Sequence, residues 1–473
     1  MATIVLALAL LSALLLVGGF GSGTRFAGSA GSGDPYFPNM GNGGYDVLDY
    51  NIDLHVDPAT GGVVGDVLIR AQATQDLDSF DLDFLGLRVK TVQVGGREAR
   101  FRRKGQELVV SSPTRLHAGG TFDVLVSYTG VPRSFTMADG SVVGWQKSGD
   151  TIFTLDEPEG AATWFPVNDT PGDKATYTLR ITVPESYTAA ANGVLAQTVA
   201  NGSDKTYIWE MKEPMASYLA AVYIGKLAPE QSTGPQGVTI RNYFAQGLVD
   251  DATKAFASTA DVMAFYDQMF GPYPFDAYGV AVPDADTQGA MENQTMSLYG
   301  RNVLQKDMSD PTGDAVYLSH ELAHQWFGDS VGLERWSDIW LNEGFATYCS
   351  WLWVGKSLGQ AAFYTQVTDG YNEVLKQNLP PPGEPPATDL FNDGVYDRGA
   401  LTLHAVRRTV GDDAFFRILR TWAARYQYKN ATTADFVALV QEISGKDLHG
   451  LIDSWLYDAA MPPLPGGGAG GSS

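Results

Sequence analysis

Two histidines four residues apart, with a glutamate beside the first, are the residues of this sequence best suited to chemistry. They lie in His320-Glu321-Leu322-Ala323-His324. Because an α-helix has 3.6 residues per turn, both imidazoles would lie on one helix face, at the spacing of two zinc ligands. Glu321 would stand beside the ion as a general base. We predict Glu343, at the start of a second helix, as third ligand, which leaves the open position typical of a catalytic zinc site.

An ordinary amphipathic helix with surface or core histidines is the alternative reading of this motif. Five loosely specified positions can match by chance. The chain has only six histidines, however, and two of them stand at ligand spacing. We therefore predict one zinc ion per chain, held by His320, His324 and Glu343.

Length, charge and cysteine content limit the classes of function. The chain has 473 residues, enough for two or three domains, and a formal net charge of −22. That charge argues against nucleic acids or anionic membrane surfaces as partners. A single cysteine, Cys349, excludes a disulfide within the chain, and we expect it to be a small buried apolar residue.

The N-terminal segment predicts export. Residues 4–17 are apolar except for Ser12, and Gly/Ser-rich sequence follows through Gly33. This run suits the apolar part of a signal peptide and is shorter than the ~20 residues that span a bilayer. The basic residues that usually precede such a run are missing. We predict residues 1–33 as a leader, a secreted or cell-envelope location in preference to a cytoplasmic one, and no stable membrane span in the mature chain.

The periodicity of apolar residues divides the remaining chain in two. Alternation over 50–56 and 177–183 and a buried run over 218–224 predict an antiparallel β domain over residues 45–228, with His55 on a polar strand face. Helical periodicity follows, with an extended piece over 278–282, a proline-rich loop over 377–395 and a disordered Pro/Gly/Ser tail over 459–473. The predicted helices cover residues 251–269, 314–327, 343–354, 398–410 and 434–444.

A further motif connects the zinc residues to a known family. Gly289-Ala290-Met291-Glu292-Asn293, followed by the histidine motif and Glu343, resembles the gluzincin zinc aminopeptidases typified by aminopeptidase N. The resemblance implies an α+β multidomain fold: an N-terminal antiparallel β-sandwich, saddle-like, then a mainly α-helical thermolysin-like catalytic domain over 229–458. It also implies a short form without the C-terminal helical domain of many relatives, and therefore a more open cleft.

The same resemblance assigns roles to further residues. Glu292 would bind the free α-amine of the substrate, Glu157 would be a second amine anchor, and the Tyr396 hydroxyl would stabilise the transition state. The backbone of Gly289 and Ala290 would add strand-like hydrogen bonds to the substrate. Taken alone, Glu292 would by default be a solvated loop carboxylate, and a packing role for Tyr396 stays open.

Four positions depart from the family pattern. Leu155 stands where glutamine is usual and Ala162 where arginine is usual, and both changes remove polar groups expected near the amine pocket. Arg398 replaces a lysine and keeps its charge, and Ser350 replaces a common glutamate. Neither the oligomeric state nor the preferred N-terminal residue follows from the sequence.

These residues together predict a zinc-dependent aminopeptidase that hydrolyses N-terminal residues from peptides through a zinc-activated water, with Glu321 as general base. Peptides with a free N-terminus are the predicted partners. Two alternatives stay open: a zinc endopeptidase with an open cleft, and a catalytically silent, zinc-bearing peptide-binding protein.

Overall fold

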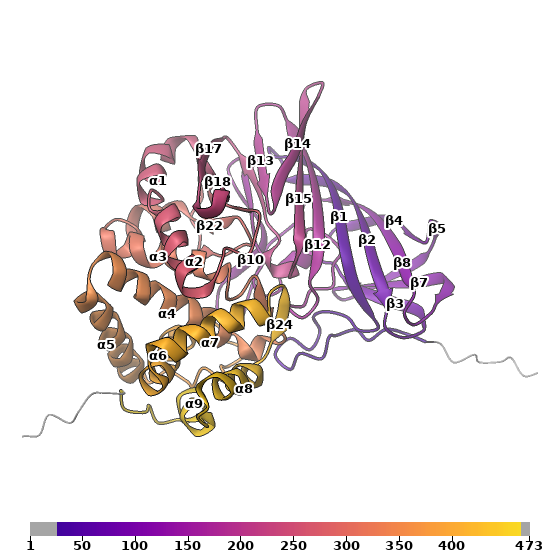
Figure 1. Ribbon diagram of the computed structural model, residues 1–473. Helices are drawn as coiled ribbons and strands as arrows, with labels where there is room; N and C mark the ends of the chain where they lie inside the picture. Colours follow the sequence, from indigo (N-terminus) through magenta and orange to yellow (C-terminus); the bar gives the residue numbers. More distant parts are fainter. Residues whose placement is uncertain (1–25, 465–473) are drawn as a thin grey trace, which may run out of the picture.

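The computed structural model describes residues 26–464, with a β-rich N-terminal half and a mainly helical C-terminal half (Figure 1). The apolar run over 4–17 and the terminal residues 465–473 lie outside the described residues. Export and a disordered tail therefore stay predictions, although residues 459–464 have no regular secondary structure. Among residues 26–464, no helix combines the length and apolar character that a bilayer crossing requires.

The N-terminal half is built around an eight-stranded sheet in the order β14-β15-β12-β1-β2-β8-β4-β5. Apolar residues alternate along its long strands and face the core, as the period-two pattern predicted. Its neighbours pair antiparallel except β1 and β12, which pair in parallel, so the domain is not purely antiparallel. The strands are β1 (Tyr45–Asp57), β2 (Gly62–Ala73), β4 (Arg88–Val94), β5 (Arg97–Glu98), β8 (Thr121–Gly130), β12 (Ala175–Pro184), β14 (Val194–Asn201) and β15 (Asp204–Met215).

Two smaller sheets complete this half. The three-stranded sheet contains β3 (Leu77–Asp83), β7 (Glu107–Leu116) and β6 (Arg100–Lys104). The five-stranded sheet contains β13 (Thr188–Ala191), β16 (Val222–Gly225), β11 (Thr151–Leu155), β10 (Val142–Ser148) and β9 (Phe135–Thr136). The second sheet matters for the site because Glu157 follows β11 directly.

A further sheet begins the C-terminal half, in the order β17-β18-β20-β22-β21, with β19 beside β18. Its strands are β17 (Leu227–Thr233), β18 (Thr239–Ala245), β19 (Ala277–Tyr278), β20 (Val280–Val282), β21 (Ala290–Met291) and β22 (Ser297–Tyr299). Strand β21 lies at one edge, so one side of its backbone is free to pair with another chain. A two-stranded parallel sheet pairs β23 (Val331–Leu333), which follows the histidine motif, with β24 (Lys429–Ala431), close to the C-terminal end of the chain.

Helices pack over this sheet and form the rest of the C-terminal half (Figure 1). They are α1 (Val249–Ala255), α2 (Thr259–Phe270), α3 (Pro311–His324), α4 (Trp340–Ser357), α5 (Gln360–Gln377), α6 (Asp393–Val410), α7 (Asp412–Arg425), α8 (Thr433–Ser444) and α9 (His449–Leu456). Helix α4 is buried on all sides from Trp340 to Val354, which makes it the centre of the helical core.

The predicted arrangement of a β-rich domain before a helical catalytic domain is confirmed, with local corrections. The single helix predicted over 251–269 is two helices, because the chain turns at residues 256–258. The helix predicted over 314–327 ends at His324, and residues 325–327 form a tight turn. Helices α5, α7 and α9 were not predicted, and the buried run over 218–224 contains a short 3-10 turn before β16.

Candidate active site

Helix α3 carries the two predicted histidine ligands near its C-terminal end. Asp310 caps its first turn by accepting hydrogen bonds from the amides of Thr312 and Gly313 at 2.8 and 3.0 Å, and Pro311 occupies the first helical position. His324 Nδ1 lies 3.2 Å from the carbonyl oxygen of Phe327, in the turn that ends the helix. A proton on Nδ1 would be donated to that carbonyl, leaving Nε2 as the lone-pair nitrogen that faces the site.

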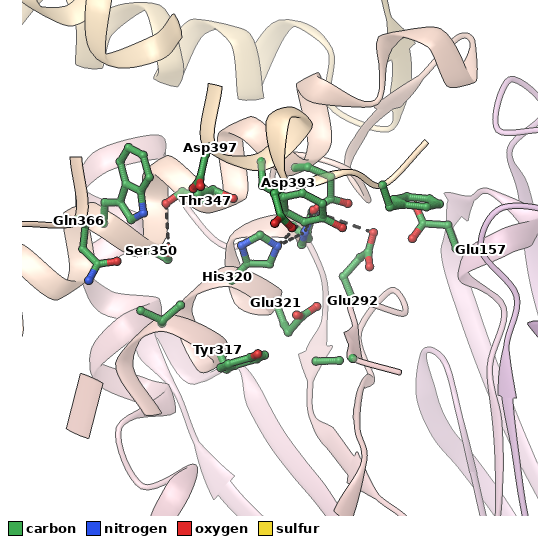
Figure 2. A pocket seen from close by; sticks show the side chains of 18 of the residues that line it. Glu157, Glu292, Tyr317, His320, Glu321, Thr347, Ser350, Gln366, Asp393 and Asp397 are labelled. Carbon is green, nitrogen blue, oxygen red and sulfur yellow. Dashed lines mark hydrogen bonds and ion pairs between the residues drawn. The ribbon is translucent and has the colours of Figure 1, made fainter. Parts of the chain in front are cut away.

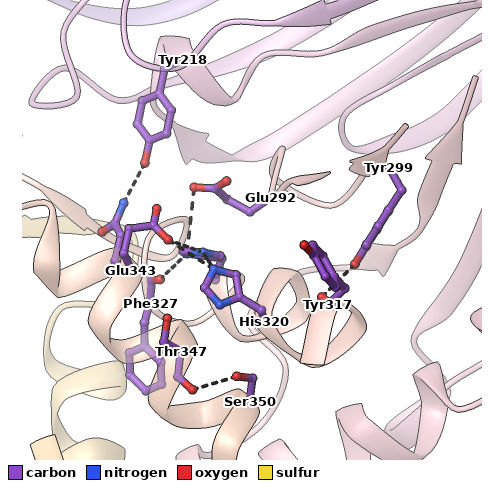
Figure 3. Close-up of polar contacts among 11 residues, drawn as sticks. Tyr218, Glu292, Tyr299, Tyr317, His320, Phe327, Glu343, Thr347 and Ser350 are labelled. Carbon is purple, nitrogen blue, oxygen red and sulfur yellow. Dashed lines mark hydrogen bonds and ion pairs between the residues drawn. The ribbon is translucent and has the colours of Figure 1, made fainter. Parts of the chain in front are cut away.

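The three predicted zinc ligands converge, as Figure 3 shows. His320 Nε2 lies 3.0 Å from His324 Nε2, and Glu343 Oε2 lies 3.2 and 3.4 Å from these two nitrogens. Zinc bonds of about 2.0–2.1 Å in a tetrahedral arrangement separate neighbouring ligand atoms by about 3.3 Å. The triangle of two imidazole nitrogens and one carboxylate oxygen therefore fits a zinc ion in both size and donor type.

Close packing of α4 against α6 brings Tyr396 to this triangle. Gly344 and Gly399 face each other where the helices meet: a Cβ on Gly344 would lie 2.8 Å from the Gly399 Cα, and a Cβ on Gly399 would lie 2.9 Å from the Gly344 Cα. Only glycine at both positions permits this approach. It places Tyr396, one turn before Gly399, against His320, with ring centroids 6.0 Å apart and planes 24° from parallel.

Two carboxylates from different domains lie beside the triangle. Glu292 follows the edge strand β21, and Glu157 follows β11 of the N-terminal half. Single oxygens of Glu157, Glu292 and Glu343 all lie within 4.8 Å of one another. Oε1 of Glu157 and Oε1 of Glu292 are buried and have no hydrogen-bond partner within residues 26–464. Buried carboxylate oxygens without donors are costly, so this corner of the site is suited to a cation that supplies them.

Electrostatics distinguish the carboxylates. Burial opposes ionisation of Glu343, but the charges and hydrogen bonds of His324 and His320 lower its pKa to about 2. Glu343 is therefore ionised, as a metal ligand must be. Burial raises the pKa of Glu157 well above its usual value, and nearby Glu292 adds to the shift. Burial also raises the pKa of Glu292. An incoming cation would favour the ionised form of both.

All nine predicted site residues line one cavity of about 500 Å³ (Figure 2). Glu321 lines it beside the ligand His320 and is 6% exposed. Gly289 and Ala290 line it through the edge of β21. The residues concerned are Glu157, Gly289, Ala290, Glu292, His320, Glu321, His324, Glu343 and Tyr396.

The departures from the family pattern fall in different places. Leu155 and Ala162 are not among the residues that line the cavity; Ala162 is buried, and its amide donates to Asp169 at 3.2 Å. Ser350 does line the cavity, and its hydroxyl donates to the Thr347 carbonyl at 2.8 Å. The Arg398 guanidinium is buried and donates to the carbonyls of Ser454, Trp455 and Asp458, which anchors the C-terminal end of α9 next to α6.

Sequence reasoning missed Gln325, which fixes the Glu292 segment to the zinc helix. Its amide donates to the Glu292 carbonyl at 2.9 Å, and its carbonyl oxygen accepts from the Thr295 amide at 2.8 Å. The side chain is fully buried. Its position directly after His324 was the only available signal. Further polar residues that line the cavity, including Thr347, Gln366, Asp393 and Asp397, were also missed.

Comparison with known families matches both halves of the chain. Residues 254–455 match the peptidase family M1 domain, and residues 47–219 match the peptidase M1 N-terminal domain. Aminopeptidase M1-D of Oryza sativa subsp. japonica is 30% identical over 324 residues, which is 65% of this chain and 37% of that protein. Aminopeptidase A of Gloydius brevicauda is 28% identical over 451 residues, or 88% of this chain and 46% of that protein. The chain thus spans less than half the length of these two relatives.

Solved structures match over the whole of their length. An M1 zinc metallopeptidase from Deinococcus radiodurans is 32% identical, with a TM-score of 0.85, over 93% of this chain and 100% of that one. A mutant of an M1 zinc metallopeptidase from the same organism, bound to a Tyr-Ser-Ala substrate, is also 32% identical, with a TM-score of 0.85, over 92% of this chain and 99% of that one.

Proposed function

The chain belongs to peptidase family M1, and from that premise we propose that it is a zinc-dependent aminopeptidase that removes N-terminal residues from peptides. One juxtaposition carries the proposal: a ligand triangle sized for zinc lies beside Glu157 and Glu292, each of which has a buried oxygen that accepts no hydrogen bond within residues 26–464. Among the described residues, the one cation near either of these oxygens is the His324 ring, whose Nδ1 lies 3.9 Å from Glu292 Oε1. The triangle supports hydrolysis at one peptide bond. The carboxylates support selection of a substrate whose positive chain end is close to that bond.

His320, His324 and Glu343 would hold one zinc ion per chain. When bound, zinc lowers the pKa of a coordinated water to about 7 and polarises a carbonyl oxygen. Glu321 would accept a proton from the attacking water and deliver it to the nitrogen of the leaving peptide. Burial raises the pKa of Glu321 well above its usual value, with the neighbouring Glu292 and Glu343 adding to the shift that His324 opposes. A carboxyl with a raised pKa is suited to carrying that proton between the two steps.

Tyr396 would donate a hydrogen bond to the oxyanion that develops on the substrate carbonyl. Its hydroxyl makes no hydrogen bond to another residue in the described part of the chain, and its ring is held against His320. Burial, together with nearby Glu343, raises the pKa of Tyr396 well above its usual value. The hydroxyl therefore keeps its proton at neutral pH and remains a donor.

Glu292 and Glu157 would bind the α-ammonium group. Because both carboxylates lie within 4.8 Å of the ligand Glu343, an ammonium bound there sits about one residue from the scissile bond. An acetylated chain end would bring an uncharged, bulkier group into a pocket of buried carboxylates, and such mismatches in desolvated sites are rejected strongly. The edge of β21 would pair with the substrate backbone and hold it extended.

Hydrolysis of alanyl p-nitroanilide and of its N-acetylated form tests the proposal directly. We expect turnover of the free amine only, with one zinc ion per chain by metal analysis, loss of turnover after chelation, and recovery on adding zinc. Equal turnover of both compounds would indicate the endopeptidase instead. Stoichiometric zinc with no turnover of any free aminoacyl amide or peptide would indicate the silent binding protein.

A further inference from the structure

The cavity continues past the zinc ligands on the side away from the amine anchors. Figure 2 shows Ser350, Gln366 and Asp397 on the opposite side of His320 from Glu157 and Glu292. These residues come from α4, α5 and α6 and line the same cavity of about 500 Å³. A substrate held by its ammonium at one end, with its first peptide bond at the zinc ligands, must place its second residue toward this far end.

Two further carboxylates, Asp393 and Asp397, line the cavity, and Figure 2 shows Asp397 on the same side of His320 as Ser350 and Gln366. Asp393 and Asp397 stand one turn apart on α6, so both lie on the same helix face. Neither forms an ion pair with a lysine, arginine or histidine among residues 26–464. Asp393 is exposed and accepts a hydrogen bond from the Gln377 amide at 3.3 Å, whereas Asp397 is half-buried and has no hydrogen-bond partner in the described chain. Neither carboxylate therefore has a cationic partner among the described residues.

The local packing leaves room for the side chain of Asp397 and for a ligand. Gly370 on α5 faces it: a Cβ at this position would lie 3.2 Å from Asp397 Oδ1. Independently of the charges, Thr347 on α4 is 8% exposed and lines the cavity, and its hydroxyl makes no hydrogen bond within the described residues. Threonine in a helix normally donates to the carbonyl four residues earlier, as Thr402 does here to Arg398 at 2.8 Å. The Thr347 side chain is thus more than nine-tenths buried, and its hydroxyl is accessible only from the cavity, where a ligand can supply its hydrogen-bond partner.

We propose, on the basis of the proposed aminopeptidase function, that Asp397 and Asp393 select peptides with lysine or arginine as the second residue. The long apolar stem of such a side chain would lie along Trp351, which lines the cavity and, like Asp397, approaches the Gly370 position. Its charged group would reach the two carboxylates, and a nitrogen proton or the adjacent substrate backbone would satisfy the Thr347 hydroxyl. A glutamate in the same position would meet two like charges.

The charge state of Asp397 is consistent with this assignment. Burial, with contributions from Asp393 and Glu373, raises its pKa to about 7. A cationic side chain would favour the ionised form and so would gain a fully charged partner on binding. Within residues 26–464, the cavity lining contains no lysine or arginine that could neutralise the pair first.

Tripeptides of the series Ala-Xaa-Ala, with lysine, alanine or glutamate as the second residue, test the proposal in the zinc-loaded enzyme. We expect kcat/KM to fall about tenfold from lysine to alanine and further for glutamate. In Asp397→Asn the lysine-to-alanine ratio should fall about tenfold, and in Asp397→Lys it should invert in favour of glutamate. Asp393→Asn should reduce the ratio less, since Asp393 is exposed. The control Asp413→Asn removes an equal charge from the exposed start of α7, outside this cavity, and should leave the ratio unchanged.

Ratios of two substrates cancel any general loss of active enzyme, so a partly misfolded variant still gives an answer. Turnover of all three peptides at equal kcat/KM by the unaltered enzyme would overturn this inference and leave the proposed function standing. A lysine preference that persists in both Asp397→Asn and Asp397→Lys would overturn the role of Asp397. No turnover of any member of the series would overturn the proposed function and this inference with it.

Discussion

Replacement of the two proposed amine anchors should have effects on kcat/KM that are far from additive. Glu292 and Glu157 are to be changed to glutamine singly and together, which keeps side-chain shape and removes charge. Their oxygens lie within 4.8 Å of each other. At an effective dielectric constant near 20, two like charges at that distance repel by on the order of 3 kcal/mol. Burial raises the pKa of both groups, and repulsion adds to the shift, from Glu292 at Glu157 and from Glu343 at Glu292. We therefore expect the pair to share a proton, which must leave before an ammonium binds.

The expected losses in kcat/KM follow from the energy needed to remove this shared proton. Each carboxylate attracts an ammonium about 4 Å away by about 4 kcal/mol at the same dielectric constant. In the unaltered site the net attraction for the ammonium is about 5 kcal/mol: two attractions of about 4 kcal/mol each, less the repulsion of about 3 kcal/mol that returns when the shared proton leaves. With one carboxylate alone the attraction is about 4 kcal/mol. Each single variant should therefore lose about fivefold in kcat/KM for alanyl p-nitroanilide. The double variant should lose about a thousandfold or more, well beyond the product of the single losses.

Steady-state kinetics of the four proteins on the free and the N-acetylated substrate would measure this cycle. The acetylated compound carries no ammonium, so all four should cleave it at the same low rate. Glu159→Gln is the matched control, because Glu159 is a neighbouring partly buried carboxylate outside the cavity. A double variant whose loss equals the product of the single losses would refute the shared-proton reasoning. Equal losses on both substrates would refute amine binding by these residues.

Four further predictions concern other parts of the catalytic half. Glu321→Gln should lower kcat at least about 10³-fold while the protein keeps its zinc, and loss of the metal in this variant would instead assign Glu321 to the ligand set. Tyr396→Phe should lower kcat about 10²–10³-fold with little change in KM, and a change confined to KM would contradict oxyanion stabilisation. Gly399→Ala should reduce the free energy of unfolding by about 1–3 kcal/mol and lower kcat, because a Cβ there would lie 2.9 Å from the Gly344 Cα. An unchanged midpoint of denaturant-induced unfolding would contradict the close contact between the two helices. Burial, aided by the charges of Arg407 and Arg408, lowers the pKa of His404 to about 4 in the folded protein. As the pH falls from about 6.5 to 4, the unfolded chain takes up a proton at this residue before the folded protein does, so the free energy of unfolding should decrease by up to about 3 kcal/mol. His404→Gln should remove that part of the pH dependence, and identical pH profiles of stability in the two proteins would contradict it.

The sequence predicted those elements whose apolar pattern has one clear period. The alternation in β1 and β12 and the helical period of α3 and α8 are of this kind, and all four elements are present close to the predicted bounds. Helices α5, α7 and α9 were missed, although the signal for α7 is present in the sequence: its buried residues stand at helical spacing, namely Phe415, Ile418, Leu419 and Trp422. The parallel pairing of β1 with β12 was not predictable either, since it depends on contacts between strands more than a hundred residues apart.

The residues of the site also differ in how far the sequence alone predicts them, according to whether their position depends on near or distant parts of the chain. His320, Glu321 and His324 follow from spacing within one helix, and that information is complete in the sequence. The contribution of Tyr396 depends on a contact between Gly344 and Gly399, two glycines on different helices whose pairing only the fold reveals. Thr347 and Asp397 carry no motif, and their place in the cavity depends on how α4, α5 and α6 meet.

The cavity is strongly acidic, and this property connects the roles proposed for its residues. Six of its lining residues are acidic, two are histidines, and no lysine or arginine lines it within residues 26–464. Carboxylates buried without cations are expensive, and a fold keeps them where ligands supply the missing charge. Here they form three groups along one cavity: Glu157 with Glu292, then Glu343 with the histidines, then Asp393 with Asp397. A metal dication at the centre and ammonium or guanidinium groups on either side would neutralise all three. Together the two proposals describe a substrate that is positive at its first amine and at its second side chain, with the bond to be broken between them, and the order of the acidic groups along the cavity supports both.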